Sequence, residues 1–547
     1  MTGRDPSYAI AAVTVVSLAT LLIGGIGWRL SRTTRDFYVA GRSVSPGWNA
    51  SAIGGEYLSA ASFLGVAGLV YAYGVDMLWF PVGYTAGYLV LLVLVAAPLR
   101  RSGAYTIPDF AEVRLESRLV RRIAAALVVG IGWLYLLPQF QGAGLALSTV
   151  TGAPRWVGAV IVAVVVVTNV VAGGMRSITF VQAVQYWIKL TAISIPAFVC
   201  LWLWTRDGQP APDLPAVLRT TWVEPMTGAR AHSVYATYST ILALCFGTMG
   251  LPHVLVRFYT NPDGRGARRT TLAVIGLLGL FYLFTPVYGV LGRVYLPSLP
   301  EGVRADAVTL LLPDAISPGT LGSLLSAVLA AGAFAAFLST ASGLTISVAG
   351  VIDQDLLGPR LSRIAGGDTR RIQHFRLATL VAVLIPYLLS WLTLSSSLAD
   401  TVGLAFAVAA STFCPLLVLG VWWPRLSVAG AAAGMASGGA LAIAATLVTV
   451  LGLGDGGTAW HGWLTALLAQ PAAWTVPIAF LVASSSGWPR RGRCPAGPRR
   501  RWSACTPPSP SRHPERPSRL PAPRPGARPG LPSRRHLPPE VRRPRRR

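Results

Sequence analysis

Long apolar runs, separated by short polar segments, fill most of the chain. A helix needs roughly 20 apolar residues to cross the hydrocarbon core of a bilayer. Runs of about this length lie at residues 8–30, 46–73, 76–99, 120–150, 155–172, 178–204, 233–258, 270–296, 320–352, 375–397, 400–421 and 427–452. A further run at 472–484 looks cut short. Because backbone groups in lipid must find partners within their own helix, the pattern predicts an all-α polytopic membrane protein with about 12–13 transmembrane helices.

The composition agrees with the membrane class and sets the last segment apart. Hydrophobic residues make up 53% of the 547 residues and charged residues 12%, and the mean hydropathy is +0.54. A soluble surface needs more charge than this. Residues 487–547 hold 18 arginines and two acidic residues, and so carry +16 of the net charge of +26. This tail is rich in proline and predicted to be disordered. A basic tail can touch anionic lipid or nucleic acid, but we interpret it as incidental and expect no nucleic-acid partner.

The tail begins abruptly after the shortened apolar run at 472–484, as if midway through a helix, which suggests a change of reading frame in a GC-rich gene. A single lysine, Lys189, among 47 basic residues fits such a genome. The five cysteines include no C-x-x-C pair, so we expect no disulfide framework, no cofactor and no structural metal site.

Arginine is concentrated in the loops that follow odd-numbered spans. The first two of these loops carry Arg29, Arg32, Arg35 and Arg42, and then Arg100, Arg101, Arg114, Arg118, Arg121 and Arg122. The alternate loops are poorer in arginine, or acidic. Since basic loops stay on the cytoplasmic side, the amino terminus is predicted outside and the carboxyl terminus in the cytoplasm, in the inner (plasma) membrane.

One stretch in the second run, Gly54–Gly65 ("GGEYLSAASFLG"), combines glycines, a carboxylate and hydroxyls in an apolar setting. A transported cation must exchange water for oxygens, and an unbroken helix uses its own carbonyls. A helix that breaks at small residues exposes them. Ser339 and Thr340 in "AAFLSTASG" offer adjacent hydroxyls to complete such a shell. Close helix packing by small residues is the alternative explanation.

The seventh run has a matching interruption, at Gly247, Gly250 and Pro252 in "LCFGTMGLPHVLVRFYT". Matching breaks in corresponding helices indicate an inverted-repeat transporter with a central site. Five spans separate the two breaks. The sequence therefore predicts a leading helix and loop (1–45), a core (46–425) with two five-helix repeats (46–204 and 233–425), terminal helices (426–486) and the tail (487–547).

Several longer segments carry a family resemblance. They are "DFYVAGRSVSPGWNASAIGGEYLSAASFLG", "AYTIPDFAEVR", "AGGMRSITFVQAVQYWIKL", "GLPHVLVRFYTNPDGRGARRT" and "FLSTASGLTISVAGVIDQDL", and they cover most of residues 36–425. The chain resembles the sodium:solute symporter family. "EYLSAASFLG" and "GLPHVLVRFYT" make it similar to the cation/acetate (monocarboxylate) symporters within that family. The resemblance implies a LeuT-like inverted repeat and a sodium ion as the coupling ion.

The resemblance also implies a sodium site between the broken helix and the helix that carries Ser339. Its ligands would be the carbonyls of Gly55, Leu58 and Ala336 and the hydroxyls of Ser339 and Thr340. Ser59 matches a hydroxyl position that influences sodium use in relatives. The proline-transporting branch places an acid where this chain has Tyr57, one residue after Glu56, which leaves the role of Glu56 open.

The candidates for substrate binding or coupling are Glu56, Tyr57, Gly54, Gly247, Gly250 and His253. A buried carboxylate needs a cation, a polar partner or a proton, so Glu56 is either a cation- or proton-sensitive element or a neutral, hydrogen-bonded fastener between helices. His253 relays a proton, contacts substrate or packs as a neutral ring. Arg257 is expected at the inner gate or as an anchor, and Asp109 in a structural pair. Free N–H groups at the breaks favour a small carboxylate substrate.

These features predict a secondary transporter that couples sodium influx to uptake of a short monocarboxylate such as acetate. The alternatives are another solute, such as proline or a different organic acid, proton instead of sodium coupling, and a membrane sensor. A membrane enzyme would need clustered His, Asp or Glu. The six histidines are scattered along the sequence, so we do not expect an enzyme.

Overall fold

The computed structural model describes residues 5–28, 44–214, 216–226, 232–357, 368–392, 397–451 and 459–485, all within the unit Met1–Thr506. In these ranges the chain forms helices and no strands. The predicted tail at 487–547, and the arginines predicted for the loop after the first span, lie outside the described residues.

The helices of the first half match the predicted spans up to residue 204. In chain order they are α1 (Pro6–Trp28), α3 (Pro46–Tyr57), the π-helix η2 (Ala61–Gly65), α4 (Val66–Tyr73), the 3-10 helix η3 (Gly74–Leu78), α5 (Trp79–Leu94), α6 (Ala96–Arg101), α7 (Ile107–Leu115), α8 (Arg118–Thr151) and α9 (Arg155–Arg206). The second predicted span thus consists of α3, η2 and α4.

The second half is helical in the same way. Its elements are α10 (Ala216–Val223), α11 (Ser233–Thr248), α12 (Pro252–Phe258), α13 (Gly264–Tyr282), α14 (Thr285–Tyr295), η4 (Ala305–Ala307), α15 (Val308–Ile316), α16 (Thr320–Val351), η5 (Ile352–Leu357), α18 (Asp368–Leu389), α19 (Leu398–Trp422), α20 (Val428–Val450), α21 (Ala459–Ala469) and α22 (Ala472–Ser485). Within the described ranges, nine helices are long and apolar enough to cross a membrane. The number is up to eleven if the bent pairs α11–α12 and α21–α22 each count as one span.

The element α9 comprises two spans joined at a glycine. At 1.5 Å per residue, 52 helical residues would extend about 78 Å, more than twice the hydrocarbon thickness. Gly174 has φ 62° and ψ −176°, a conformation that a side chain would disfavour, and it interrupts the helix there. The two parts, Arg155–Met175 and Ser177–Arg206, correspond to the spans predicted at 155–172 and 178–204.

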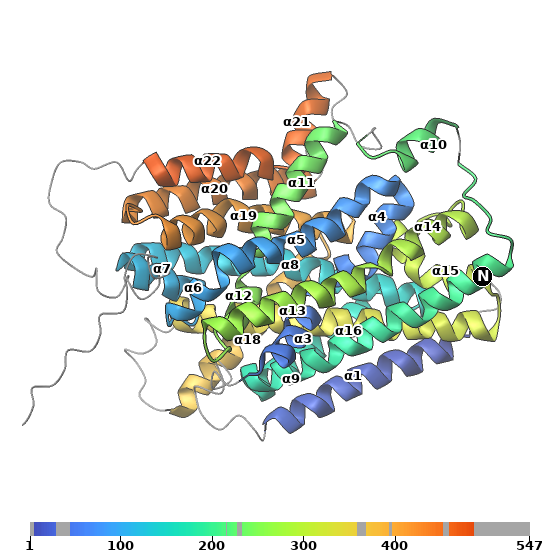
Figure 1. The fold of residues 1–547 in the computed structure, drawn as a ribbon. Helices are drawn as coiled ribbons and strands as arrows, with labels where there is room; N and C mark the ends of the chain where they lie inside the picture. The colour runs from blue at the N-terminus through green and yellow to red at the C-terminus, as the bar shows by residue number, and fades with distance from the viewer. Residues whose placement is uncertain are drawn as a thin grey trace, which may run out of the picture. The chain divides into compact units, whose positions relative to one another are not determined.

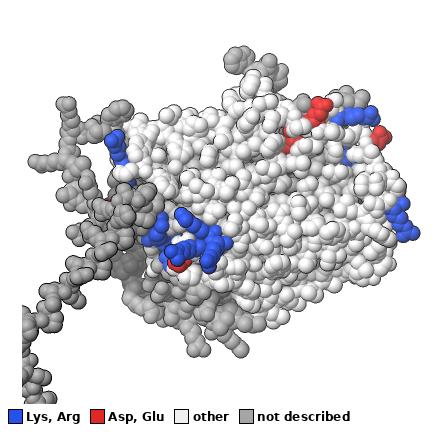
Figure 2. Space-filling view, viewed as in Figure 1, with Lys and Arg blue, Asp and Glu red and all other residues white. Residues whose placement is uncertain are grey.

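The two interrupted helices lie inside the bundle. Figure 1 shows the long helices running side by side, with α1 at one edge and α20 and α22 near the opposite edge. α3 packs against α9, α13 and α16, and α11 packs against α5 and α19. Figure 2 shows charged side chains near both ends of this face, separated by a broad band without them. Such a band is the surface that a bilayer covers.

Arginines at one end of the bundle bind neighbouring segments of the chain. Arg100 donates hydrogen bonds to the carbonyls of Asn261 and Pro262, at 2.5 and 2.6 Å. Arg121 pairs with Asp109 at 2.9 Å and with Asp355 at 2.5 Å. The structural pairing predicted for Asp109 is therefore confirmed. The side of the membrane on which this end lies stays a prediction from the arginine pattern.

Candidate substrate and cation site

Both predicted helix interruptions are present. α3 ends at Tyr57, and the next residue, Leu58, leaves the helical conformation (φ −71°, ψ 88°) before the chain resumes as η2. α11 ends at Thr248, Leu251 is extended (φ −75°, ψ 116°), and Pro252 begins α12. The axes of α11 and α12 differ by 40°.

The glycines of the first motif do not form the break itself. α3 continues through Gly54 and Gly55, and the interruption lies at Leu58 and Ser59. A Cβ atom on Gly54 would collide with the ring of Tyr186, and one on Gly55 with the backbone carbonyl of Gln182. The first break thus lies within the stretch predicted to be breakable, Gly54–Gly65, and its two glycines instead allow α9 to approach closely.

Gly247 and Gly250 have a similar packing function in the second broken helix. Their missing Cβ atoms would meet the backbone carbonyls of Phe406 and Ala409 in α19. Gly250 also lies in the break, where its N–H donates to the carbonyl of Gly247 at 2.7 Å. Direct contact of these glycines, or of Gly54, with a substrate stays a prediction.

The five residues predicted as sodium ligands come together where α3 meets α16. The hydroxyl of Ser339 donates to the carbonyl of Ala336 at 3.0 Å, and the hydroxyl of Thr340 donates to the carbonyl of Glu56 at 2.5 Å. The carbonyls of Gly55 and Leu58 face the same place. All are buried. Their role as sodium ligands stays a prediction.

A lysine side chain reaches this group of oxygens from α9. The ammonium nitrogen of Lys189 donates to the Leu58 carbonyl at 2.8 Å, to the Ser339 hydroxyl at 2.5 Å and to the Gly55 carbonyl. Lys189 has no exposed surface. Sequence reasoning treated this lysine only as a mark of codon usage. The available signal was its position inside the apolar span 178–204, where an ionisable residue is functional by default.

Ser59 lies in the break but has a different neighbour. Its hydroxyl accepts a hydrogen bond from the hydroxyl of Tyr135 at 3.5 Å. The next N–H group, that of Ala60, donates to the side-chain oxygen of Gln139 at 3.1 Å. The first of these contacts connects Ser59 to the tyrosine cluster described below; its predicted influence on cation use is untested.

Glu56 forms a buried ion pair with Arg257 of α12. Their closest atoms, Oε2 and Nε, are 2.6 Å apart, and the two side chains are 2% and 1% exposed. The guanidinium also donates to Thr179 at 2.5 Å and to the side-chain oxygen of Gln182. Gln182 in turn donates to the carbonyl of Ser339 at 2.7 Å. This network joins both broken helices to α9 and α16. Arg257, in the last turn of α12, therefore lies next to the site; its expected role as an inner gate or an anchor stays a prediction.

Aromatic side chains surround the other side of the breaks. We call Tyr57, Tyr84, Tyr88, Tyr135, Tyr282, Phe406 and His253 the tyrosine cluster; each contacts at least one other member, with ring centroids 4.9–6.0 Å apart. The hydroxyl of Tyr57 hydrogen-bonds to Thr248 at 3.0 Å, which connects the first break to the second. The cluster draws on α3, α5, α8, α12, α13 and α19.

Several polar atoms of this cluster are buried without a partner among the described residues. They are the hydroxyls of Tyr84 and Tyr88 and both ring nitrogens of His253. A buried polar group that lacks a hydrogen bond costs about 1–3 kcal/mol. Such groups are therefore candidates to bind a polar ligand.

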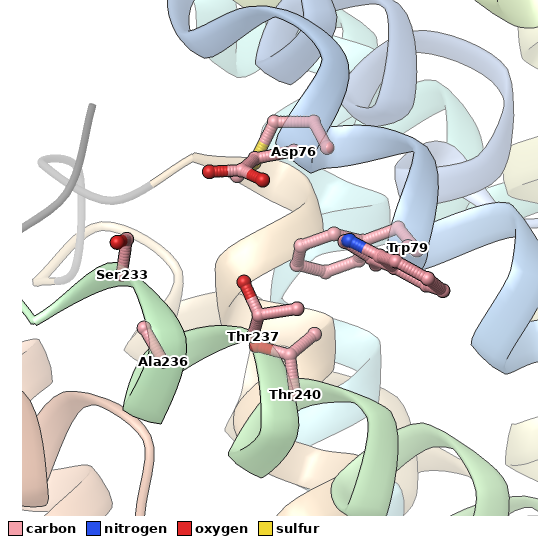
Figure 3. Close-up of a pocket in the computed structure, with 8 residues that line it drawn as sticks. Asp76, Trp79, Ser233, Ala236, Thr237 and Thr240 are labelled. Atoms are coloured by element: carbon pink, nitrogen blue, oxygen red, sulfur yellow. The ribbon is translucent and has the colours of Figure 1, made fainter. Parts of the chain in front are cut away.

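A small pocket lies between η3 and the start of α11. Figure 3 shows Asp76 and Trp79 on one side, and Ser233, Ala236, Thr237 and Thr240 of α11 on the other. The cavity holds about 10 Å³, roughly the space of one water molecule. Phe80 also lines it and contacts the ring of Tyr84, 6.2 Å between centroids. The pocket therefore adjoins the tyrosine cluster.

Comparison with known proteins agrees with this arrangement. The sodium:solute symporter family matches residues 37–438. The uncharacterized symporter YwcA of Bacillus subtilis is 31% identical, over 85% of this chain and 91% of its own length. A monocarboxylic acid transporter of Corynebacterium glutamicum is 31% identical, over 88% of this chain and 91% of its own length.

Solved structures show the same fold at low identity. A sodium-coupled sialic acid symporter superimposes with a TM-score of 0.66 at 16% identity, covering 88% of this chain and 97% of that chain. The transporter MhsT in complex with L-phenylalanine gives a TM-score of 0.51 at 16% identity, covering 81% and 99%.

A helical bundle with two interrupted helices around a buried polar site defines a membrane transporter with the LeuT-like fold. The family match and the two relatives narrow this class further. The chain belongs to the sodium:solute symporter family. The proteins of this family that it resembles are symporters, not enzymes, and the fold together with the family makes it a plasma-membrane protein.

Proposed function

We propose that this protein is a secondary symporter that takes up a short-chain monocarboxylate, such as acetate, by alternating access. The observation that carries the proposal is the tyrosine cluster at the two helix breaks. Its unpartnered donors, the hydroxyls of Tyr84 and Tyr88, match the acceptor oxygens of a carboxylate. The monocarboxylic acid transporter of C. glutamicum supports the same substrate class.

The charges beside the cluster favour an anion over a zwitterion. At the first break, Lys189 and Arg257 bring two basic groups against the single carboxylate of Glu56, so an anion suits this place better than a zwitterion, which carries no net charge. A monocarboxylate is such an anion.

The family suggests sodium as the coupling ion, and the oxygens gathered at Ser339 and Thr340 support a cation site there. The Lys189 ammonium group lies among those oxygens, so it affects whether a sodium ion can bind there. We therefore propose a cation-coupled symporter; whether sodium itself occupies these oxygens is treated separately below.

Uptake of labelled acetate, propionate and pyruvate into proteoliposomes tests the proposal. The full chain is reconstituted and tested for counterflow, in which trapped unlabelled acid draws labelled acid inward. We expect accumulation above empty liposomes, and we expect Tyr84→Phe and Tyr88→Phe each to raise the KM for acetate about 10-fold, the size of a lost hydrogen bond to a charged group. Tyr238→Phe, an exposed tyrosine of α11, is the control. A membrane sensor would bind the acid without any flux, and that result would reject the proposal.

A further inference from the structure

The predicted sodium site is occupied by a side chain of the protein itself. Lys189 extends from α9 to the carbonyls of Gly55 and Leu58 and the hydroxyl of Ser339. These are three of the five oxygens that the family resemblance assigns to sodium. An ammonium group has three donors and no acceptor, and all three donors are matched here. The lysine is therefore fully coordinated by the atoms that would otherwise hold the ion.

The other two predicted ligands are also engaged by the protein. The carbonyl of Ala336 accepts the hydrogen bond of the Ser339 hydroxyl at 3.0 Å. The hydroxyl of Thr340 donates to the carbonyl of Glu56 at 2.5 Å. A sodium ion would have to compete for each of the five oxygens.

Charge opposes a second cation at the same place. An ammonium group and a sodium ion bound to the same oxygens would be two like charges a few ångströms apart, with little water to screen them. The carboxylate of Glu56 is already paired with Arg257. The residues that surround the Lys189 ammonium group on α3 and α16 supply carbonyls and hydroxyls, not further negative charge.

We propose that Lys189 is a tethered cation that takes the place of sodium at the first helix break, so that this transporter does not use a sodium ion there. The proposal rests on the proposed uptake of a monocarboxylate, because that flux is one of its readouts. It departs from the sodium coupling predicted from the family resemblance. Lys189 acts as a positioning residue: its ammonium group holds the exposed carbonyls of α3 against α16, as the ion would.

The first test compares sodium with choline in counterflow of labelled acetate by the wild-type chain. Coupling between two bound ligands typically changes affinity by roughly 5–150-fold. When choline replaces sodium on both sides of the membrane, we expect the rate of acetate counterflow to change by less than about 5-fold. A wild-type protein that needs sodium would overturn the inference about Lys189 and leave the proposed function intact. Absence of counterflow in both salts would instead reject the proposed function.

The second test has a readout that does not depend on transport. Lys189→Ala and Lys189→Gln remove the ammonium group and free the carbonyls of Gly55 and Leu58. We expect sodium, but not choline, to raise the melting temperature of Lys189→Ala by about 2 °C or more, because an ion that binds only the folded state stabilises it. The wild type should show no sodium-specific shift. Thr191→Ala, an exposed position of α9 bonded only to its own helix, is the matched control and should behave as wild type.

The outcomes separate cleanly. The proposal that Lys189 takes the place of sodium would be overturned if sodium stabilised the wild type. It would also be overturned if the Lys189 variants folded but sodium did not stabilise them. If neither variant folds, the wild-type comparison of sodium and choline decides alone.

Discussion

The ion pair between Glu56 and Arg257 gives the sharpest prediction for stability. Both side chains are almost fully buried, and their closest atoms are 2.6 Å apart. Removing one partner of a buried pair leaves an uncompensated charge, which typically costs 3–5 kcal/mol. Glu56→Gln keeps an oxygen that can accept from the guanidinium, so we expect a loss near the lower limit, about 3 kcal/mol. Arg257→Gln strands the carboxylate, and we expect about 4–5 kcal/mol.

The double variant shows whether the two charges interact with each other or contribute to the free energy of unfolding independently. Glu56→Gln combined with Arg257→Gln removes both charges together, so no charge is left unpaired. We expect the double variant to lose no more free energy of unfolding than Arg257→Gln alone. The difference from the sum of the two single losses is then an interaction energy of about 3 kcal/mol in the thermodynamic cycle.

The assay is the free energy of unfolding from SDS titration in mixed micelles, followed by tryptophan fluorescence. Glu301→Gln in an exposed loop is the control and should stay within about 0.5 kcal/mol of wild type. Losses that simply add in the double variant would refute the reasoning, because they would mean that the two charges do not interact in the folded protein.

Two other substitutions test different parts of the molecule. Gly343→Ala in α16 would place a Cβ against the Glu56 carboxylate and the Gln182 amide, and we expect it to abolish acetate counterflow. The control, Gly350→Ala in the same helix, has no atom within 4 Å of its Cβ and should transport normally. Equal activities of the two variants would contradict the close packing at Gly343. Burial raises the pKa of Asp306, despite its 2.7 Å pair with Arg304, so its charged form is disfavoured in the folded state. The stability from this group is present below its unfolded pKa and lost as pH rises through its folded pKa. The melting temperature of Asp306→Asn minus that of the wild type should therefore increase as pH rises from about 4 to 7. A difference that decreases over this range would contradict the raised pKa of Asp306.

The fold followed from the sequence because hydropathy alone marks a membrane helix. Even the turn at Gly174, which divides α9, was predicted as the gap between two apolar runs. The interruptions were predicted from glycine and proline, and Pro252 does begin α12. The break after Tyr57 falls within the predicted stretch, but the sequence did not show that Gly54 and Gly55 serve close packing, because only the positions of Tyr186 and Gln182 in α9 reveal that use.

The site was predicted only in part, for a physical reason. A family motif identifies the oxygens around Ser339, but the ammonium group that meets them lies 150 residues earlier, on another helix. Arg257 and Glu56 are 201 positions apart, and no local pattern connects them. The tyrosine cluster takes one or two side chains from each of six helices. Contacts between distant segments depend on how each helix is rotated about its axis, and apolar runs without a polar face do not specify that rotation.

One face of α9 holds both interrupted helices at once. Thr179 and Gln182 bind the guanidinium of Arg257 in α12, and Lys189 binds the carbonyls of Gly55 and Leu58 at the first break. The ten residue-to-residue steps from Thr179 to Lys189 extend about 15 Å, close to half the thickness of the hydrocarbon layer. Rotation of α9 about its axis by the angle of a single residue, roughly 100°, would move the three side chains away from both Arg257 and the carbonyls at the first break. α9 thus serves as a shared support for both interrupted helices.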